Sequence, residues 1–224
     1  RPTLRLAEAA RRQGVGRFVF VSSLEARGPD GAPGPDSPYG ESKLAAEAGL
    51  RRVSGLEAVL LRPAGVYGPR DRDLLVLFRL AGWGVLPHAQ SAHPLQPVYA
   101  SDVAAAVLAA LSRSCGPEPL ELAEARSYRW DEVRSSLQRA VGRPVRLLRV
   151  PDALYLGAGR LFEAASRFGD APPLLDARRA RALSVHAYTC DPTPALERLG
   201  WEAEVPLAEG LIRTAEWYRQ HGWL

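Results

Sequence analysis

Two short runs of apolar residues constrain the fold of this chain more than any other feature. The run Arg17–Ser23 contains four consecutive β-forming residues and ends in two small hydroxyl residues, and Glu57–Pro63 has the same apolar character. Continuous apolar runs of this length are typical of strands buried in a parallel sheet. A helical periodicity over Thr3–Gln13, which ends at Gly14, precedes the first run. The sequence therefore predicts an α/β fold built on parallel strands.

Small polar residues and glycines follow both predicted strands. Ser22 and Ser23 end the first strand, and the second runs into Ala64–Pro69, where glycine and proline let the backbone approach a ligand. In open α/β sheets the ligand lies outside the carboxyl ends of the strands. A loop rich in glycine and proline, residues 28–38, leads back toward the same edge, although two serines at a strand end also fit plain turn chemistry. We therefore expect a ligand site at these strand ends.

Lys43 is the single lysine among the 29 lysines and arginines of the chain, and it follows Tyr39 by four residues. Residues four apart share one face of a helix, and Pro38 suits the first helical position. A phenol titrates near ~10, and a close positive charge lowers that pKa toward working pH. A compact ammonium suits this task better than the wide guanidinium of arginine. The pair therefore predicts a general acid/base, and its ordinary alternative is a surface pair on an amphipathic helix.

The remainder of the chain predicts a small lobe built onto the sheet. A short helix at Leu74–Leu80 and a loop over residues 88–98 come first, followed by a helix to Leu111 that Ser101 or Asp102 caps. The later pattern predicts strands at 119–123 and 145–150 and helices at 130–141, 154–168, 191–201 and 207–217. Helices and short strands in this order are expected of an α/β lobe.

Composition argues against several other classes of protein. The net charge is only +4 and the arginines are scattered, so the pI of about 9.4 does not predict a nucleic-acid partner. No secretory signal is found, and the longest apolar run, Val103–Leu111, is too short to span a bilayer. Cys115 and Cys190 lie far apart, and His88 and His93 lack metal-ligand spacing, so neither a disulfide nor a metal site is expected. These features predict a cytoplasmic protein without a membrane partner.

Five ordered motifs of this chain resemble those of the extended short-chain dehydrogenase/reductase family, nearest to its NAD-dependent epimerase/dehydratase and 3β-hydroxysteroid dehydrogenase-like members. The motifs are Phe18–Ser23, Tyr39–Lys43, Leu61–Pro69, Val98–Val103 and Leu199–Trp201. The resemblance implies the C-terminal part of a Rossmann-type doubly wound parallel sheet, with its first strands missing, and a small α/β substrate-binding lobe. Residues 1–115 would belong to the NAD(P)-binding domain, with lobe segments near 75–98, and residues 116–224 mainly to the lobe and closing helices.

The resemblance also implies a role for each residue of the site. Tyr39 is the expected general acid/base, Lys43 lowers its pKa and holds the ribose of NAD or NADP, and Ser23 hydrogen-bonds the substrate oxygen. The expected cofactor-binding residues are Val21, Ser22, Tyr39, Lys43, Pro63, Ala64 and Val66. The expected substrate-binding residues are Ser23, Gly65 and Arg70.

Two departures from the family pattern refine these expectations. The chain lacks the glycine-rich phosphate loop and the residue that selects NAD or NADP, and it has no methionine. We therefore expect an N-terminally truncated piece of a longer protein, which alone binds cofactor poorly and is inactive. The chain also has Gly65 where sugar-nucleotide epimerases usually place an asparagine, and it contains no asparagine.

These observations favour an NAD(P)-dependent oxidoreductase that interconverts a secondary alcohol and a ketone on a small hydrophobic substrate, as hydroxysteroid or flavonol reductases do. One alternative is a nucleotide-sugar epimerase or dehydratase, and the other is a non-catalytic NAD(P)-sensing scaffold. The resemblance further implies that the helix of Tyr39 can take part in a homodimer.

Overall fold

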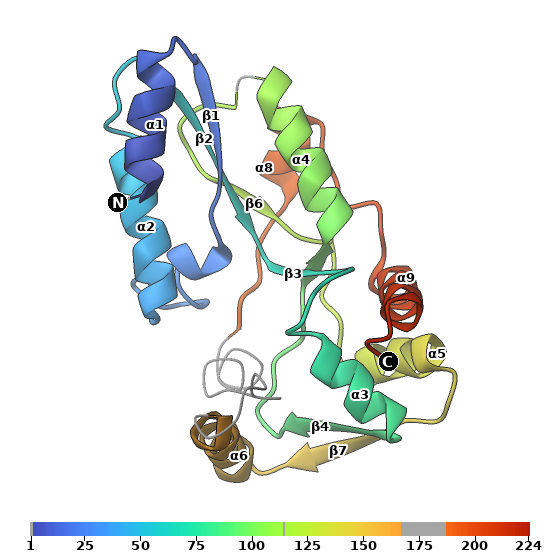
Figure 1. Ribbon diagram of the computed structural model, residues 1–224. Coiled ribbons are helices and arrows are strands. Elements are labelled where there is room, and N and C mark those ends of the chain that lie inside the picture. Colours follow the sequence, from blue (N-terminus) through green and yellow to red (C-terminus); the bar gives the residue numbers. More distant parts are fainter. Residues whose placement is uncertain (1, 114, 167–186) are drawn as a thin grey trace. The chain divides into compact units, whose positions relative to one another are not determined.

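The computed structural model of the 224-residue chain describes residues 2–113, 115–166 and 187–224 (Figure 1). The described residues form two compact units: unit 1 within 1–66, 96–126 and 188–205, and unit 2 within 67–95, 127–187 and 206–224. Residues 167 and 168 of the helix predicted at 154–168 lie outside the described residues. The predicted boundary between a cofactor-binding part (residues 1–115) and a substrate-binding lobe (residues 116–224) is a division by functional role. It therefore stays a prediction.

Unit 1 is built around a parallel sheet. Strands β1 (Arg17–Val21), β2 (Glu57–Pro63) and β6 (Leu120–Leu122) pair in the order β1-β2-β6. Val19 of β1 lies opposite Val59 of β2, and both strand pairings are parallel. The two apolar runs therefore form parallel strands, as predicted. They are neighbours in the sheet, and their carboxyl ends lie at the same edge.

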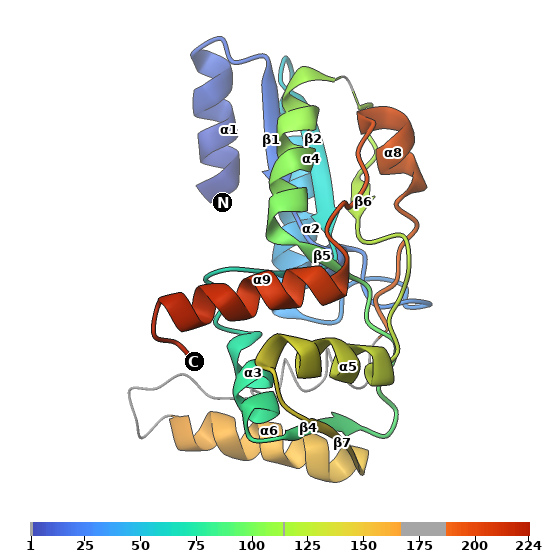
Figure 2. The same ribbon diagram turned by 90° about the vertical axis from the view of Figure 1, so that its right-hand side faces the viewer.

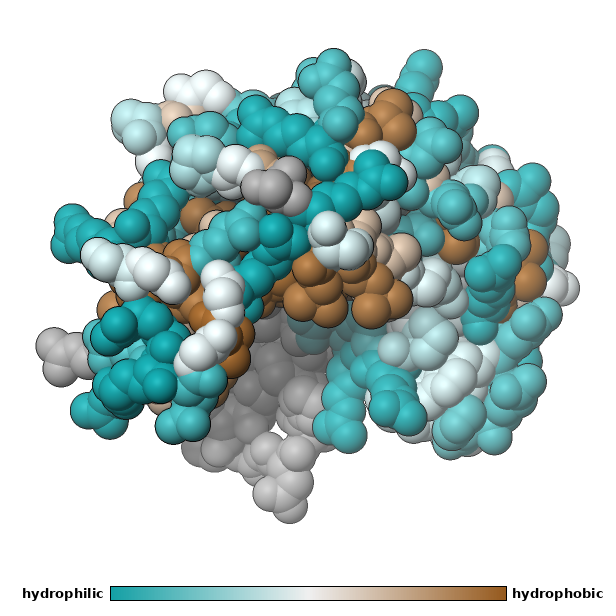
Figure 3. Space-filling view, turned by 90° about the horizontal axis from the view of Figure 1, so that it is seen from above, coloured by the Kyte–Doolittle hydropathy of each residue, from teal (hydrophilic) through white to brown (hydrophobic). Residues whose placement is uncertain are grey.

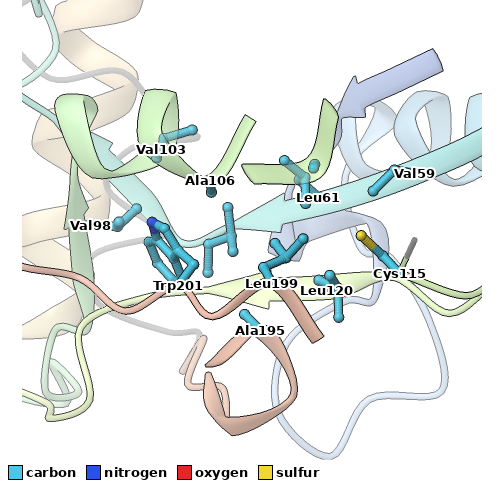
Figure 4. Packing of buried hydrophobic residues seen from close by; sticks show 12 residues of the cluster. Val59, Leu61, Val98, Val103, Ala106, Cys115, Leu120, Ala195, Leu199 and Trp201 are labelled. Carbon is cyan, nitrogen blue, oxygen red and sulfur yellow. The ribbon is translucent and has the colours of Figure 1, made fainter. Parts of the chain in front are cut away.

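Helices cover both faces of this sheet because the side chains of β2 alternate between two apolar clusters (Figure 1). The helices are α1 (Pro2–Arg12), α2 (Pro38–Leu50), α4 (Ala100–Ser112) and α8 (Thr193–Leu199). Leu60 clusters with Leu50 of α2. Leu61 clusters with Ala106 of α4 and Leu199 of α8 (Figure 4). Each of these leucines is at most 1% exposed, and burial of a leucine side chain contributes about 1.5–3 kcal/mol.

The segment after α8 is fixed to the first turn of α4. The indole Nε1 of Trp201 donates to the backbone oxygen of Asp102 at 2.8 Å, and the Val205 N–H donates to Asp102 Oδ2 at 3.1 Å. The predicted cap by Ser101 or Asp102 is wrong, since α4 begins at Ala100 without a side-chain cap. The carboxylate of Asp102 accepts from a distant backbone N–H instead.

Unit 2 combines helices with a two-stranded parallel sheet. Its elements are α3 (Leu75–Gly82), β4 (Val85–Ala89), α5 (Trp130–Val141), β7 (Arg146–Val150), α6 (Asp152–Ser166) and α9 (Leu207–Gln220). Figure 2 shows α5 and α9 side by side. The ring of Phe78 in α3 meets that of Tyr218 in α9 edge to face, with centroids 5.2 Å apart. The helix predicted at 130–141 and the strand at 145–150 are thus confirmed.

The loop predicted over residues 88–98 is wrong at both ends. His88 lies in β4, which pairs in parallel with β7. The other end enters β5 (Pro97–Tyr99), which pairs with β3 (Gly65–Tyr67). Pro87 within β4 concealed the first strand, because proline cannot donate to a ladder and is normally confined to strand edges. In the described part of the chain β4 has β7 alone as ladder neighbour, so its other side tolerates the proline.

Several large apolar side chains of unit 1 lie on its surface. Leu6, Leu108 and Leu111 are 62%, 67% and 56% exposed. Figure 3 shows hydrophobic residues as separate areas among hydrophilic ones on the face seen from above. Leu108 and Leu111 are three residues apart and share one face of α4, whereas Leu6 lies on α1. Over the described ranges, no helix has the length and apolar character that a membrane crossing requires.

His88 is a buried ionisable residue of unit 2. It is 6% exposed and stacks on Trp130 with ring centroids 5.6 Å apart. Burial lowers the pKa of His88. The Ala89 backbone opposes this effect, the positive charge of Arg149 lowers the pKa further, and the negative charge of Asp131 opposes it least. The folded chain therefore favours the neutral imidazole.

We expect the free energy of unfolding to fall as pH drops below about 6.5, because the unfolded chain then protonates His88 while the folded chain resists. His88→Phe keeps a ring against Trp130 but cannot titrate. Denaturant unfolding at about pH 7.5 and about pH 5.5 should show a smaller loss of stability in His88→Phe than in the unchanged chain. An equal loss in both proteins would contradict this expectation.

Candidate active site

The candidate site lies at the carboxyl edge of the unit 1 sheet. β1 ends at Val21 and β2 ends at Pro63, and Val21 lies opposite Leu61. The pairing continues one residue further, since the Ser22 N–H donates to the Leu61 oxygen at 2.6 Å. The segments that leave β1 and β2 therefore start next to each other.

Lys43 of α2 reaches this edge. Its Nζ atom donates to the Val21 oxygen at 2.9 Å and lies 5.0 Å from the ring centroid of Phe20 and 5.5 Å from that of Tyr39. Burial lowers the pKa of Lys43, and the Glu47 carboxylate opposes this by favouring the ammonium. An ammonium has three N–H groups, of which the bond to Val21 uses one. Lys43 can therefore donate to a further acceptor, such as a ribose hydroxyl, while it stays beside the tyrosine ring.

Tyr39 stands in the first turn of α2, one turn before Lys43. Ser37 is the N-cap and its Oγ accepts from the Gly40 N–H at 3.0 Å, while Pro38 occupies the start of the helix as predicted. The side chain of Tyr39 is 41% exposed. The cap fixes the backbone of the tyrosine and leaves its side chain accessible to a small molecule.

Ser23 begins a short 3-10 helix, η1 (Leu24–Ala26), directly after the β1 edge. Its half-buried Oγ accepts from the Glu25 N–H at 3.2 Å. Accepting this bond uses a lone pair of the oxygen and leaves the O–H able to donate. The backbone of η1 therefore orients Ser23 as a hydrogen-bond donor.

Two contacts join η1 to the start of α2. The N-cap Ser37 also donates through Oγ to Glu25 Oε2 at 2.8 Å. A Cβ atom built on Gly40 would lie only 2.3 Å from the Glu25 backbone oxygen, closer than atoms pack. Glycine therefore allows the approach that brings the segments of Ser23 and Tyr39 together. Local sequence patterns did not point to Gly40 or Glu25, although a glycine in the first turn of a predicted helix is a usable signal.

The hydroxyl of Ser22 lies in the interior. Ser22 is 2% exposed and donates through Oγ to Glu47 Oε1 at 2.5 Å. Glu47 is 1% exposed and also accepts from Arg62, Nε to Oε1 at 2.9 Å and Nη2 to Oε2 at 2.6 Å. A cofactor contact at Ser22 would therefore use its backbone, and its predicted cofactor role stays a prediction.

The exposed fraction of the residues after β2 increases from Ala64 to Val66. Ala64 is 9% exposed and packs against Leu24 of η1. Val66 is 44% exposed, and a Cβ atom on Gly65 would meet no atom within 4 Å. These two exposed residues, together with the spare N–H groups of Lys43, fit the nicotinamide and ribose of NAD or NADP.

Arg70 is the one predicted site residue that belongs to unit 2. Its backbone has a left-handed φ of 69°, which is uncommon for a residue with a side chain. The structure brings the other predicted residues, Val21 to Ser23, Tyr39, Lys43 and Pro63 to Val66, to one edge of the unit 1 sheet. The predicted contact of Arg70 with substrate stays a prediction.

A parallel sheet with helices on both faces, and a candidate site at the carboxyl ends of its strands, is the arrangement of doubly wound α/β folds, which bind their ligands there. The model of the NAD dependent epimerase/dehydratase family matches residues 1–122. This chain therefore belongs to the NAD-dependent epimerase/dehydratase family. The predicted family is confirmed, and the dependence on NAD in the family's description agrees with the predicted cofactor class.

Known relatives support the same fold. Ceramide reductase of Caulobacter vibrioides is 36% identical over 221 residues, which cover 97% of this chain and 67% of that protein. UDP-glucose 4-epimerase of Mycolicibacterium smegmatis is 29% identical, with 97% of this chain and 67% of that protein covered. The crystal structure of UDP-glucose 4-epimerase from Thermotoga maritima with UDP-glucose has a TM-score of 0.73 at 26% identity, covering 98% of this chain and 68% of its own. These similarities confirm the predicted doubly wound α/β fold.

We expect Gly40→Ala to destabilise the chain by about 1–3 kcal/mol, the usual cost of an atom forced into filled space. The added Cβ would collide with the Glu25 backbone oxygen and separate η1 from α2. Gly157→Ala is the matched control, because Gly157 is also helical and its added Cβ meets no atom within 4 Å. The free energy of unfolding from denaturant titrations should fall in Gly40→Ala and hold or rise in Gly157→Ala. Equal stability of the two variants would contradict the close approach.

Proposed function

We propose that this chain carries the catalytic part of an NAD(P)-dependent oxidoreductase that interconverts a secondary alcohol and a ketone. One observation carries the proposal: the Lys43 ammonium is held on the Val21 oxygen at 2.9 Å, beside the ring of Tyr39, at the carboxyl edge of a parallel sheet. In this proposal the positive charge of Lys43 favours the phenolate form of Tyr39 as the proton acceptor.

Each residue of the site has one task in the oxidation of an alcohol. Ser23 donates its O–H to the substrate oxygen and fixes its position. Tyr39, as phenolate, accepts the hydroxyl proton, and Lys43 compensates the negative charge before the transfer. Bound NAD(P)⁺ supplies the acceptor for the hydride that leaves the carbinol carbon. In the reverse direction Tyr39 returns the proton to the ketone oxygen.

The chain's own residues offer contacts to one half of the cofactor. Lys43 and Tyr39 would hold the ribose hydroxyls, and the exposed residues Gly65 and Val66 would lie along the nicotinamide. The glycine-rich phosphate loop is not among the 224 residues, so we propose that tight binding of NAD(P) needs a longer polypeptide that contains this chain.

A hydrophobic substrate is the class we propose. The sequence similarity to a ceramide reductase favours an apolar alcohol or ketone, and Gly65 offers no amide for a nucleotide sugar. Similarity to UDP-glucose 4-epimerases supports a second candidate, a nucleotide-sugar epimerase that uses the same tyrosine–lysine pair. A non-catalytic NAD(P)-sensing scaffold is the third. The homodimer and the cytoplasmic location stay predictions.

Nicotinamide binding separates these candidates. NADH and NADPH fluorescence would be titrated with the 224-residue chain and with the longest natural polypeptide that contains it. Cofactor that exchanges freely, together with turnover of apolar ketones, supports the oxidoreductase. Cofactor that copurifies and stays bound through turnover supports the epimerase. Absence of binding by both polypeptides supports neither enzyme and overturns the proposal.

In the longest natural polypeptide that contains this chain, we expect Tyr39→Phe to reduce turnover by ~10²–10⁴-fold, the usual contribution of a positioned acid/base, with little change in cofactor affinity. Phenylalanine keeps the ring beside Lys43 and removes only the ionisable oxygen. Steady-state kinetics and NAD(P)H fluorescence titration measure the two quantities separately. Turnover near that of the unchanged enzyme would refute the role of Tyr39.

We also expect Lys43→Arg to lose most activity, because the wide planar guanidinium cannot place a point charge on the Val21 oxygen next to the tyrosine. Arg52→Lys is the matched control, since it makes the reverse exchange at an exposed residue just beyond α2. Kinetics of the two variants should differ by ~10-fold or more. Comparable activity in both would show that any cation suffices at residue 43.

A further inference from the structure

Glu47 is a buried carboxylate for which packing alone gives no reason. It is 1% exposed, while an apolar side chain of similar volume would avoid the cost of removing a charge from water. Glu47 lies four residues after Lys43 and eight after Tyr39, so all three share one face of α2. The hydrogen-bond partners of this buried carboxylate indicate its role.

The Glu47 carboxylate connects the ends of two strands to α2. It accepts from Ser22 Oγ at 2.5 Å and from the Arg62 guanidinium at 2.9 and 2.6 Å. Ser22 follows Val21, whose oxygen accepts from Lys43, and the Ser22 N–H donates to the Leu61 oxygen at 2.6 Å. Glu47 therefore holds the residues next to both members of the Val21–Leu61 strand pair. A shift of this carboxylate would move the carbonyl that Lys43 binds.

We propose that Glu47 is a positioning residue: its carboxylate, held by Ser22 and Arg62, keeps the Lys43 ammonium on the Val21 oxygen beside Tyr39. Glu47 touches neither substrate nor cofactor in this assignment and acts through Lys43. The role deepens the proposed function and rests on it, since it concerns the tyrosine–lysine pair of that reaction.

The charges around Lys43 predict the direction of the effect. Glu47 faces it from α2, and Arg62 of β2 offsets part of that negative charge through the ion pair. The other groups near its ammonium are the Val21 oxygen and the Phe20 ring, both from β1, and the Tyr39 ring. Burial lowers the pKa of Lys43 and Glu47 opposes this. Removing the Glu47 charge should therefore let Lys43 lose its proton at lower pH.

The single lysine of the chain allows a direct test without substrate or cofactor. Lysine labelled with ¹³C at Cε gives one side-chain NMR signal, which reports the titration midpoint of Lys43 and its place beside the two aromatic rings. In Glu47→Gln, we expect the midpoint to fall by about one pH unit, the low end of the ~1–3 units that a neighbouring opposite charge produces. The Cε signal at neutral pH should also move toward that of a free lysine.

A second variant keeps the proposal falsifiable, because Glu47→Gln leaves Arg62 unpaired and can fail to fold. Glu47→Gln combined with Arg62→Gln removes both charges, so the midpoint should return toward that of the unchanged chain, while the neutral-pH Cε signal stays displaced. The matched control is Glu57→Gln. It breaks the ion pair between Arg17 and Glu57, the first residues of β1 and β2, whose N–O distances are 3.0 and 2.8 Å. The control should move neither quantity.

The outcomes separate this proposal from the proposed function. If the midpoint and the neutral-pH signal stay unchanged in both Glu47 variants while the free energy of unfolding falls, Glu47 is merely structural and the proposal is overturned. If the Lys43 signal changes as expected but the longest natural polypeptide that contains this chain shows no turnover of any alcohol or ketone, the positioning of Lys43 stands and the proposed function fails. Where turnover is found, kcat of Glu47→Gln should fall roughly tenfold, with its alkaline limb at lower pH.

Discussion

Burial of β2 on both faces is the constraint on which the rest of unit 1 depends. Leu60 and Leu61 point into separate apolar clusters, so helices must cover both sides of the strand. Strands covered in this way are joined by crossovers and run parallel, which places all their carboxyl ends at one edge. The site at that edge follows from the topology, since Val21 and Pro63 can only leave the sheet there.

Two sets of contacts stabilise the site: hydrogen bonds among buried polar groups and the close approach of a glycine to η1. Glu47, Ser22 and Arg62 connect the two strand ends to α2. Gly40 lets the start of α2 meet the backbone of η1. The exposed Tyr39 is therefore supported by residues that are themselves nearly inaccessible, which is the arrangement that keeps a reactive group in place at a solvent-facing edge.

Local patterns predicted those parts of the fold that depend on local physics. The strands at β1 and β2, the helix at 130–141 and the Tyr39–Lys43 spacing each follow from residues close together in sequence. Contacts between residues distant in sequence were not predicted. Asp102 accepts a hydrogen bond from Val205 and does not cap its own helix. Strand β4 contains Pro87, which argues against a strand locally, and it forms by pairing with β7. For the site, spacing predicted the pair itself but not Glu47 or Gly40, whose roles arise only when α2 packs on the strands.

The interleaving of the two units bears on how this chain is made. Neither unit is continuous in sequence, and the apolar cluster around Leu61 is completed by Trp201, whose indole bonds to a residue 99 positions earlier. A chain that emerges from the ribosome N-terminus first therefore leaves the part of this β2 face that α8 and Trp201 cover exposed until residue 201 has been synthesised. Folding dominated by such long-range contacts is slow, and apolar strands left open meanwhile are exposed to aggregation. Production of this protein should consequently be more sensitive to chaperone supply and synthesis rate than its ordinary composition suggests.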